Sequence, residues 1–95
     1  MAGEQVVQRG YRITGRVQGV FFRVWTRDTA SSLGLRGTVR NRPDGSVEAH
    51  FIGPIPVVEE MAMRLREGPS ASRVDEVEEV ESGDPVEGDT FEILL

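Results

Sequence analysis

A glycine-containing loop, residues 15–23, holds the residues of this chain that are best suited to binding an anion. It reads Gly15, Arg16, Val17, Gln18, Gly19, Val20, Phe21, Phe22 and Arg23. The loop joins an expected strand to an expected helix, whose first turn has unpaired N–H groups and a partial positive charge. No Ser, Thr, Asp or Asn stands just before that helix to accept these hydrogen bonds, and Arg23 is a cation where an acid is usual. The pattern predicts a cradle for an anion such as phosphate, with a plain, water-covered turn as the alternative.

Arg23 and Asn41 are the side chains that we expect to do chemistry with such an anion. A guanidinium fork binds two phosphate oxygens at once. An asparagine amide can hold an attacking water and donate to developing charge, but it takes up a proton poorly. Such a pair suits only a good leaving group, such as the carboxylate of an acyl phosphate, whose conjugate acid has a pKa of about 4. As the alternative, Asn41 is a turn residue before Pro43-Asp44-Gly45.

The elements that position these residues follow the order β-α-β-β-α-β. Alternating apolar residues predict strands at about 6–14, 35–42 and 46–52, a longer half-exposed strand near 74–80 and a short edge strand near 91–95. Apolar residues at helical spacing predict helices from Phe22 to Gly34 and from about Pro54 to Gly68. This order predicts an α+β ferredoxin-like sandwich, an antiparallel sheet with two helices on one face. We expect a flexible end at residues 1–5 and a single domain at 6–95.

That topology brings the loop and Asn41 to the same edge of the sheet. The first two strands of the fold run in the same direction with the third between them, so their carboxyl ends meet. Because neighbouring strands are about 4.8 Å apart, Asn41 should lie roughly 10 Å from the loop. That distance is about the span of a bound phosphate and a water. The sequence therefore predicts one shared site for the loop and Asn41.

Composition restricts the partners of this chain. It has 95 residues, no cysteine and a net charge of −5 at pH 7. Residues 1–45 carry eight arginines against three acids, whereas residues 46–95 carry three arginines against thirteen acids. A local positive field around the loop would attract a small anion although the whole protein is acidic, but solvated faces also segregate charge in this way. We expect a small-molecule partner, no nucleic acid, no membrane and a cytoplasmic monomer.

Other residues predict no second site. His50, the one histidine, is expected to be a solvated surface residue. The acids of residues 75–81 lack the spacing of a calcium loop and are expected on a solvated strand face, so we expect neither a metal nor a cofactor. Phe22 and Trp25 are expected in the core.

Taken together, these residues resemble the acylphosphatase family, and the resemblance covers almost the whole chain. Its parts are the loop ending in Phe22-Arg23, then Ala30, Leu33-Gly34-Leu35, Gly37, Val39-Arg40-Asn41, Asp44-Gly45, Val47-Glu48, Gly53, Gly68-Pro69 and Phe91-Glu92-Ile93. The family consists of small ferredoxin-like enzymes that hydrolyse the carboxyl-phosphate bond without a cofactor, giving a carboxylate and inorganic phosphate. The resemblance implies that Arg23 binds the phosphate and that Asn41 positions the hydrolytic water. It also implies a cradle made by the backbone amides of Gln18, Gly19, Val20, Phe21, Phe22 and Arg23.

The chain departs from the family pattern at two positions, Phe21 and Thr38. Phe21 fills a loop position that often holds a smaller residue, and we expect it either to narrow access to the loop or to reorder the loop. Thr38 replaces an aromatic residue common before the Val-Arg-Asn segment, and we expect it to loosen the packing behind Asn41. A non-catalytic ferredoxin-like module that binds an anion or a partner is the alternative function. Nucleic-acid binding on the sheet face is a third, disfavoured by the acidic half and the lack of an aromatic-rich strand.

Overall fold

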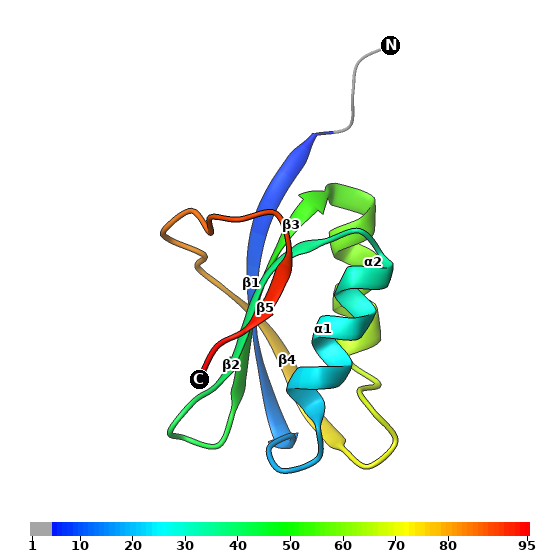
Figure 1. Ribbon diagram of the computed structural model, residues 1–95. Coiled ribbons are helices and arrows are strands. Elements are labelled where there is room, and N and C mark those ends of the chain that lie inside the picture. The colour runs from blue at the N-terminus through cyan, green and yellow to red at the C-terminus, as the bar shows by residue number, and fades with distance from the viewer. Residues whose placement is uncertain (1–4) are drawn as a thin grey trace.

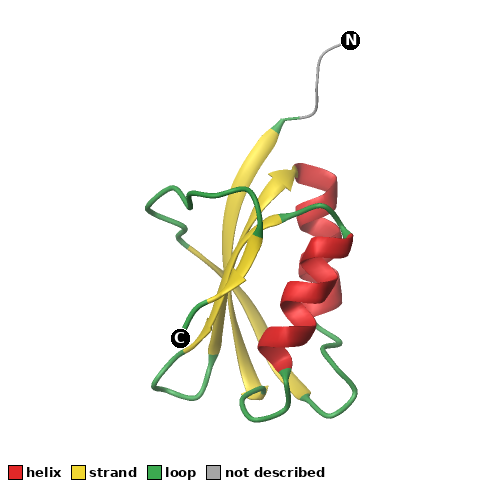
Figure 2. Cartoon of the chain, in the orientation of Figure 1, coloured by secondary structure: helices red, strands yellow, loops and turns green. Residues whose placement is uncertain are grey.

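A computed structural model describes residues 5–95, in which a five-stranded sheet carries two helices on one face (Figures 1 and 2). The elements in chain order are β1 (Val6–Arg16), α1 (Phe22–Ser32), β2 (Arg36–Asn41), β3 (Val47–Pro54), α2 (Ile55–Leu65), β4 (Arg73–Val80) and β5 (Phe91–Ile93). The expected flexible end, residues 1–5, lies outside the described residues except for Gln5. The carbonyl of Gln5 accepts a hydrogen bond from the N–H of Ile55 at 3.3 Å.

The strands lie side by side in the order β4-β1-β3-β2-β5. β3 pairs antiparallel with both β1 and β2, and β4 pairs antiparallel with β1, which is the expected ferredoxin-like arrangement. β5 pairs parallel with β2, so the sheet is mixed. This differs from the sequence analysis, which predicted an antiparallel sheet. The difference arises because segment 81–90 returns across the sheet and lays the last strand along the free edge of β2, in the same direction.

The core lies between the sheet and the helices and follows the expected periodicities. Alternate residues of β3 point inward, and residues four apart on α1 do the same. The inward residues of these two elements are Val47, Ala49, Phe51, Phe22, Thr26 and Ala30. Phe51 stacks on Phe91 with ring centroids 5.4 Å apart, whereas Trp25 packs at the edge of the core, partly buried. Each large side chain buried in this way contributes roughly 1.5–3 kcal/mol to the stability of the fold. Because Phe22 is the first residue of α1, its burial holds the start of this helix against the core.

One end of this sandwich collects the segments that matter for function. Because β1 and β2 are parallel to each other through β3, the β1–α1 loop and the β2–β3 turn emerge at the same end (Figure 1). The expected adjacency of the glycine-containing loop and Asn41 is therefore confirmed.

Candidate active site

The β1–α1 loop presents a helix start whose backbone donors are unused. Phe21 is the N-cap residue of α1, its side chain makes no capping hydrogen bond, and the first turn contains no acid. Within residues 5–95, the backbone N–H groups of residues 18–24 donate no hydrogen bond. A cluster of free N–H groups at the positive end of a helix dipole is an anion-binding arrangement.

Two residues give the loop its shape through a left-handed backbone. Gly19 has φ 76°, and a Cβ added there would meet nothing within 4 Å, so the glycine is needed for conformation and not for space. Phe21 has φ 61° and is the one non-glycine residue with positive φ among residues 5–95. A left-handed conformation costs such a residue about 1–2 kcal/mol. The burial of the adjacent Phe22, 1% exposed, anchors the strained residue in place.

Six residues line a pocket of about 270 Å³ at this end of the sheet. They are Val17, Gly19, Phe21, Phe22, Arg23 and Asn41. The structure thus brings together five of the seven residues that the sequence marked as a site. The other two lie beside the pocket: Val20 is buried in the core, and the Gln18 side chain points to a neighbouring turn.

Arg23 supplies the charge of the pocket. It forms no ion pair within residues 5–95, and its Nη1 donates only a long hydrogen bond, 3.4 Å, to the carbonyl of Leu94. Leu94 reaches this position because its own N–H binds the carbonyl of Val39 at 2.8 Å, which extends the pairing of β5 with β2. A carbonyl leaves the guanidinium charge uncompensated, so the charge adds to the field of the helix start. The sequence alone did not indicate this contact with the C-terminal segment.

Asn41 is the last residue of β2, as expected, and pairs with Val47. It lies on the same sheet face as Val39, which is buried, so its side chain continues the inner face beyond the core and lines the pocket. Its amide group makes no hydrogen bond within residues 5–95, and so both its donor and its acceptor can bind a ligand or a water. Thr38 alternates to the opposite face, away from Asn41.

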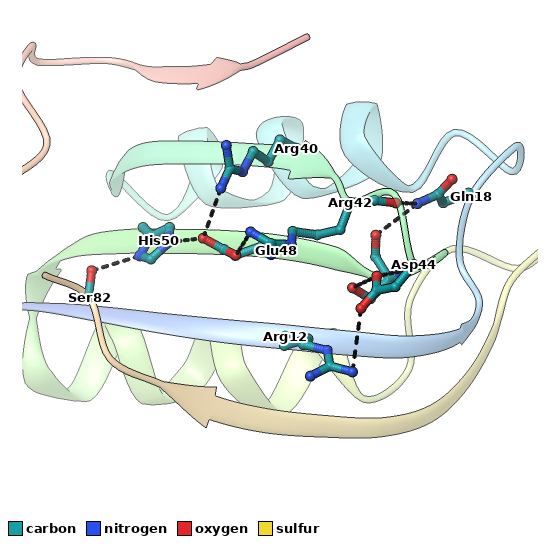
Figure 3. Close-up of polar contacts among 9 residues, drawn as sticks. Arg12, Gln18, Arg40, Arg42, Asp44, Glu48, His50 and Ser82 are labelled. Atoms are coloured by element: carbon teal, nitrogen blue, oxygen red, sulfur yellow. Dashed lines mark hydrogen bonds and ion pairs between the residues drawn. The ribbon is translucent and has the colours of Figure 1, made fainter.

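Gln18 ties the loop to the turn that follows Asn41 (Figure 3). Its Nε2 donates to the carbonyls of Arg42 and Ser46, each at 2.8 Å. The turn is itself closed by Asp44, which accepts hydrogen bonds from the N–H and hydroxyl of Ser46 at 2.9 and 2.6 Å. These two bonds lower the pKa of Asp44. Sequence reasoning missed the Gln18 side chain, because only the β1-β3-β2 order shows which carbonyls it faces.

His50 is not the solvated residue that the sequence predicted. Its Nε2 donates to Glu48 at 2.7 Å, and its Nδ1 lies 2.7 Å from the hydroxyl of Ser82 (Figure 3). Segment 81–90 covers this part of the sheet, and Gly10 leaves room for the ring, since a Cβ there would come within 2.8 Å of it. The histidine side chain is only 17% exposed as a result.

Glu48 is the centre of this second cluster, on the sheet face opposite the helices. It pairs with Arg42 at 2.9 Å and more loosely with Arg40 at 3.9 Å, the two residues that flank Asn41 (Figure 3). The hydrogen bond from His50 is the main cause that lowers the pKa of Glu48, with burial acting in the opposite direction and the arginines adding to the lowering. The cluster therefore holds the end of β2 from its outer face.

The remaining titratable groups of residues 5–95 form no further centre. The acids of β4 are exposed, as expected for a solvated strand face. Among residues 5–95, no three His, Cys, Asp or Glu side chains are grouped so that they could hold a metal ion. No helix in that range has the length and apolar character needed to span a membrane.

The fold and the pocket define a class: a small ferredoxin-like α+β domain with an uncapped helix start, an arginine and an asparagine at one end of its sheet. The family model for acylphosphatase matches residues 9–93. The acylphosphatase of Nitrobacter hamburgensis is 58% identical over 73 residues, which are 77% of this chain and 74% of that protein. That of Rhodopseudomonas palustris strain BisB5 is 50% identical over 91 residues, 90% of this chain and 92% of that one.

Solved structures agree with these matches. The crystal structure of the acylphosphatase from Bacillus subtilis superposes with a TM-score of 0.86 at 31% identity and covers 96% of this chain and 100% of its own. The chain belongs to the acylphosphatase family. It is an enzyme of that family, and the alternative of a non-catalytic binding module is not favoured.

Proposed function

We propose that this chain hydrolyses the carboxyl-phosphate bond of acyl phosphates, with Arg23 and the loop amides binding the phosphate and Asn41 positioning the water. The observation that carries the proposal is that all of these groups line or border one pocket of about 270 Å³. The lining contains no carboxylate that would repel a phosphate. Membership of the acylphosphatase family supports the choice of substrate.

The first step is binding of the phosphate group. Free N–H groups of residues 18–23 surround its oxygens, and the Arg23 guanidinium exchanges its long bond to the Leu94 carbonyl for a bidentate grip on two oxygens. The exchange is favourable because one long bond to a neutral carbonyl is replaced by two parallel bonds to an oppositely charged group. Fixed donors also need little rearrangement when charge develops in the transition state.

The second step is attack by water. The carbonyl of the Asn41 amide accepts a hydrogen bond from the water, and its NH₂ donates to a developing oxygen charge. The water oxygen bonds to phosphorus as the bond from phosphorus to the carboxylate oxygen breaks, and the water's proton passes to a phosphoryl oxygen. The carboxylate leaves as an anion and needs no general acid, because its conjugate acid has a pKa of about 4. The lack of a His, Asp, Glu, Cys or Lys in the pocket lining fits this reaction and not hydrolysis of a phosphate monoester.

We also propose that the enzyme acts as a cytoplasmic monomer on a small molecule, without nucleic acid or membrane. The absence of cysteine fits a reducing compartment, and the net charge of −5 opposes binding to a phosphate backbone. Size-exclusion chromatography with light scattering tests the monomeric state, and cell fractionation tests the cytoplasmic location.

The direct experiment is to incubate the purified protein with acetyl phosphate and follow phosphate release, with and without EDTA. We expect release well above the spontaneous rate and no effect of EDTA. No release above that rate would refute the reaction, and loss of release on adding EDTA would refute the metal-free mechanism.

Arg36→Ala is the matched control for Arg23→Ala, because Arg36 also donates to a backbone carbonyl, that of Gly88 at 3.1 Å, but lies at the other end of β2. Only Arg23→Ala should weaken the inhibition by inorganic phosphate.

A further inference from the structure

Phe21 is exposed to an extent that packing does not explain. Its exposed fraction is 81%, and it is the one aromatic residue among the large exposed apolar side chains of residues 5–95. The next residue, Phe22, is 1% exposed, so the chain turns one ring into the core and the other outward. Residues with a strained backbone cluster at active sites and ligand-binding sites. The outward phenyl ring on the left-handed residue Phe21 therefore points to a role in ligand binding.

The ring stands at the mouth of the pocket. Phe21 lines that pocket together with Gly19, Arg23 and Asn41. The space beside Gly19 is open, since a Cβ added there would meet nothing within 4 Å. The pocket is therefore bordered by open space beside Gly19 and by the apolar ring of Phe21, and a group that emerges from it passes Phe21.

We propose that Phe21 is a specificity-determining residue that binds the acyl part of the substrate, and that the enzyme favours acyl phosphates with an aromatic or extended apolar acyl group. This inference rests on the proposed function, in which the phosphate occupies the loop amides and Arg23. The acyl group then extends outward past Phe21, where an apolar or flat group loses contact with water against the ring. Apart from Arg23 and Asn41, which are committed to phosphate and water, the lining offers no polar side chain to recognise a polar acyl group.

The test compares benzoyl phosphate with acetyl phosphate in the wild type, in Phe21→Ala and in Phe21→Asn. The readout is the ratio of kcat/KM for the two substrates within each variant, so a change in the loop itself, which affects both substrates, cancels. We expect both substitutions to lower the ratio of benzoyl to acetyl phosphate about tenfold, as for the loss of roughly 50 Å² of apolar contact. Met63→Ala is the control, because Met63 is 67% exposed on α2 and outside the pocket, and its ratio should equal that of the wild type.

Phe21→Asn separates the ring from the backbone, because asparagine tolerates the left-handed conformation but has no apolar ring. A wild-type ratio in both Phe21 variants would overturn the inference while leaving the proposed function intact. A wild-type ratio in Phe21→Asn alone would also overturn it, since backbone conformation and not the ring would then set the preference. If the wild type releases no phosphate from either substrate, the proposed function itself fails. Thermal unfolding and binding of inorganic phosphate show that each variant is folded with a working loop.

Discussion

Gln18 is the side chain whose replacement should change both the stability of the fold and the binding of phosphate. Replacing it by alanine removes two hydrogen bonds, from Nε2 to the carbonyls of Arg42 and Ser46, each 2.8 Å long and partly buried. At about 0.5–1.5 kcal/mol for each bond, the free energy of unfolding should fall by roughly 1–3 kcal/mol. For a domain of this size, each kcal/mol lowers the melting temperature by about 4–8 °C.

The same substitution should also weaken phosphate binding, although Gln18 does not line the pocket. It frees the loop from the turn after Asn41, so ordering the free N–H groups around phosphate becomes a cost of binding. We expect the dissociation constant of inorganic phosphate to rise about fivefold, which corresponds to about 1 kcal/mol. Urea unfolding gives the stability, and isothermal titration calorimetry gives the phosphate affinity.

Gln8→Ala is the matched control for this prediction. Gln8 makes three hydrogen bonds, to the Ser82 hydroxyl at 2.7 Å, the Asp84 carbonyl at 2.9 Å and the Val86 N–H at 3.0 Å, all outside the site. It should lose comparable stability and keep the phosphate affinity of the wild type. If the two variants bind phosphate equally well, the idea that Gln18 organises the loop is wrong. If Gln18→Ala is as stable as the wild type, the two hydrogen bonds do not hold the turn.

Three further predictions follow from the geometry. Gly19→Ala and Gly34→Ala should each cost about 1 kcal/mol in urea unfolding, because their φ angles are 76° and 75° and both have open space at Cβ, but only Gly19→Ala should weaken phosphate binding; equal phosphate affinities would contradict this. The lowered pKa of Glu48 means that its charged form favours the fold, so its contribution to stability is present above its ordinary pKa of about 4.5 and is lost as the pH falls through the lowered value. Unfolding of Glu48→Gln between about pH 3 and 6 should therefore depend less on pH than that of the wild type, and an unchanged slope would count against the cluster. The rate with acetyl phosphate should be nearly flat between about pH 5 and 8, because the pocket lining contains no His, Asp, Glu, Cys or Lys, and a steep sigmoid would reveal a missed acid or base.

Most of the fold could be predicted from the sequence because its signals are local. Alternation in β3, helical spacing in α1 and the turn Pro43-Asp44-Gly45 each specify one element, and their order leaves few topologies. The direction of β5 could not be predicted in this way. Its three residues, Phe91–Ile93, alternate equally well in either orientation, and the path of segment 81–90 decides.

The functional site also contains residues whose place could be predicted from local sequence signals and residues whose role could not. Gly19, Arg23 and Asn41 could be placed together because helix capping and strand order are read from residue types. The roles of Gln18 and His50 depend on what faces them across strands, namely the Ser46 carbonyl and the Glu48 carboxylate. A glutamine and a histidine carry no local sequence signal for such contacts, so only the folded structure shows these contacts.

The claim that one pocket both binds phosphate and positions water is tested most directly with Asn41→Ala. Turnover of acetyl phosphate is measured in the same preparation in which calorimetry gives the affinity for inorganic phosphate. We expect kcat to fall by about 10²-fold or more, because a positioned donor and acceptor are lost, while phosphate binds nearly as in the wild type. A normal kcat in Asn41→Ala, with phosphate still bound, would contradict it.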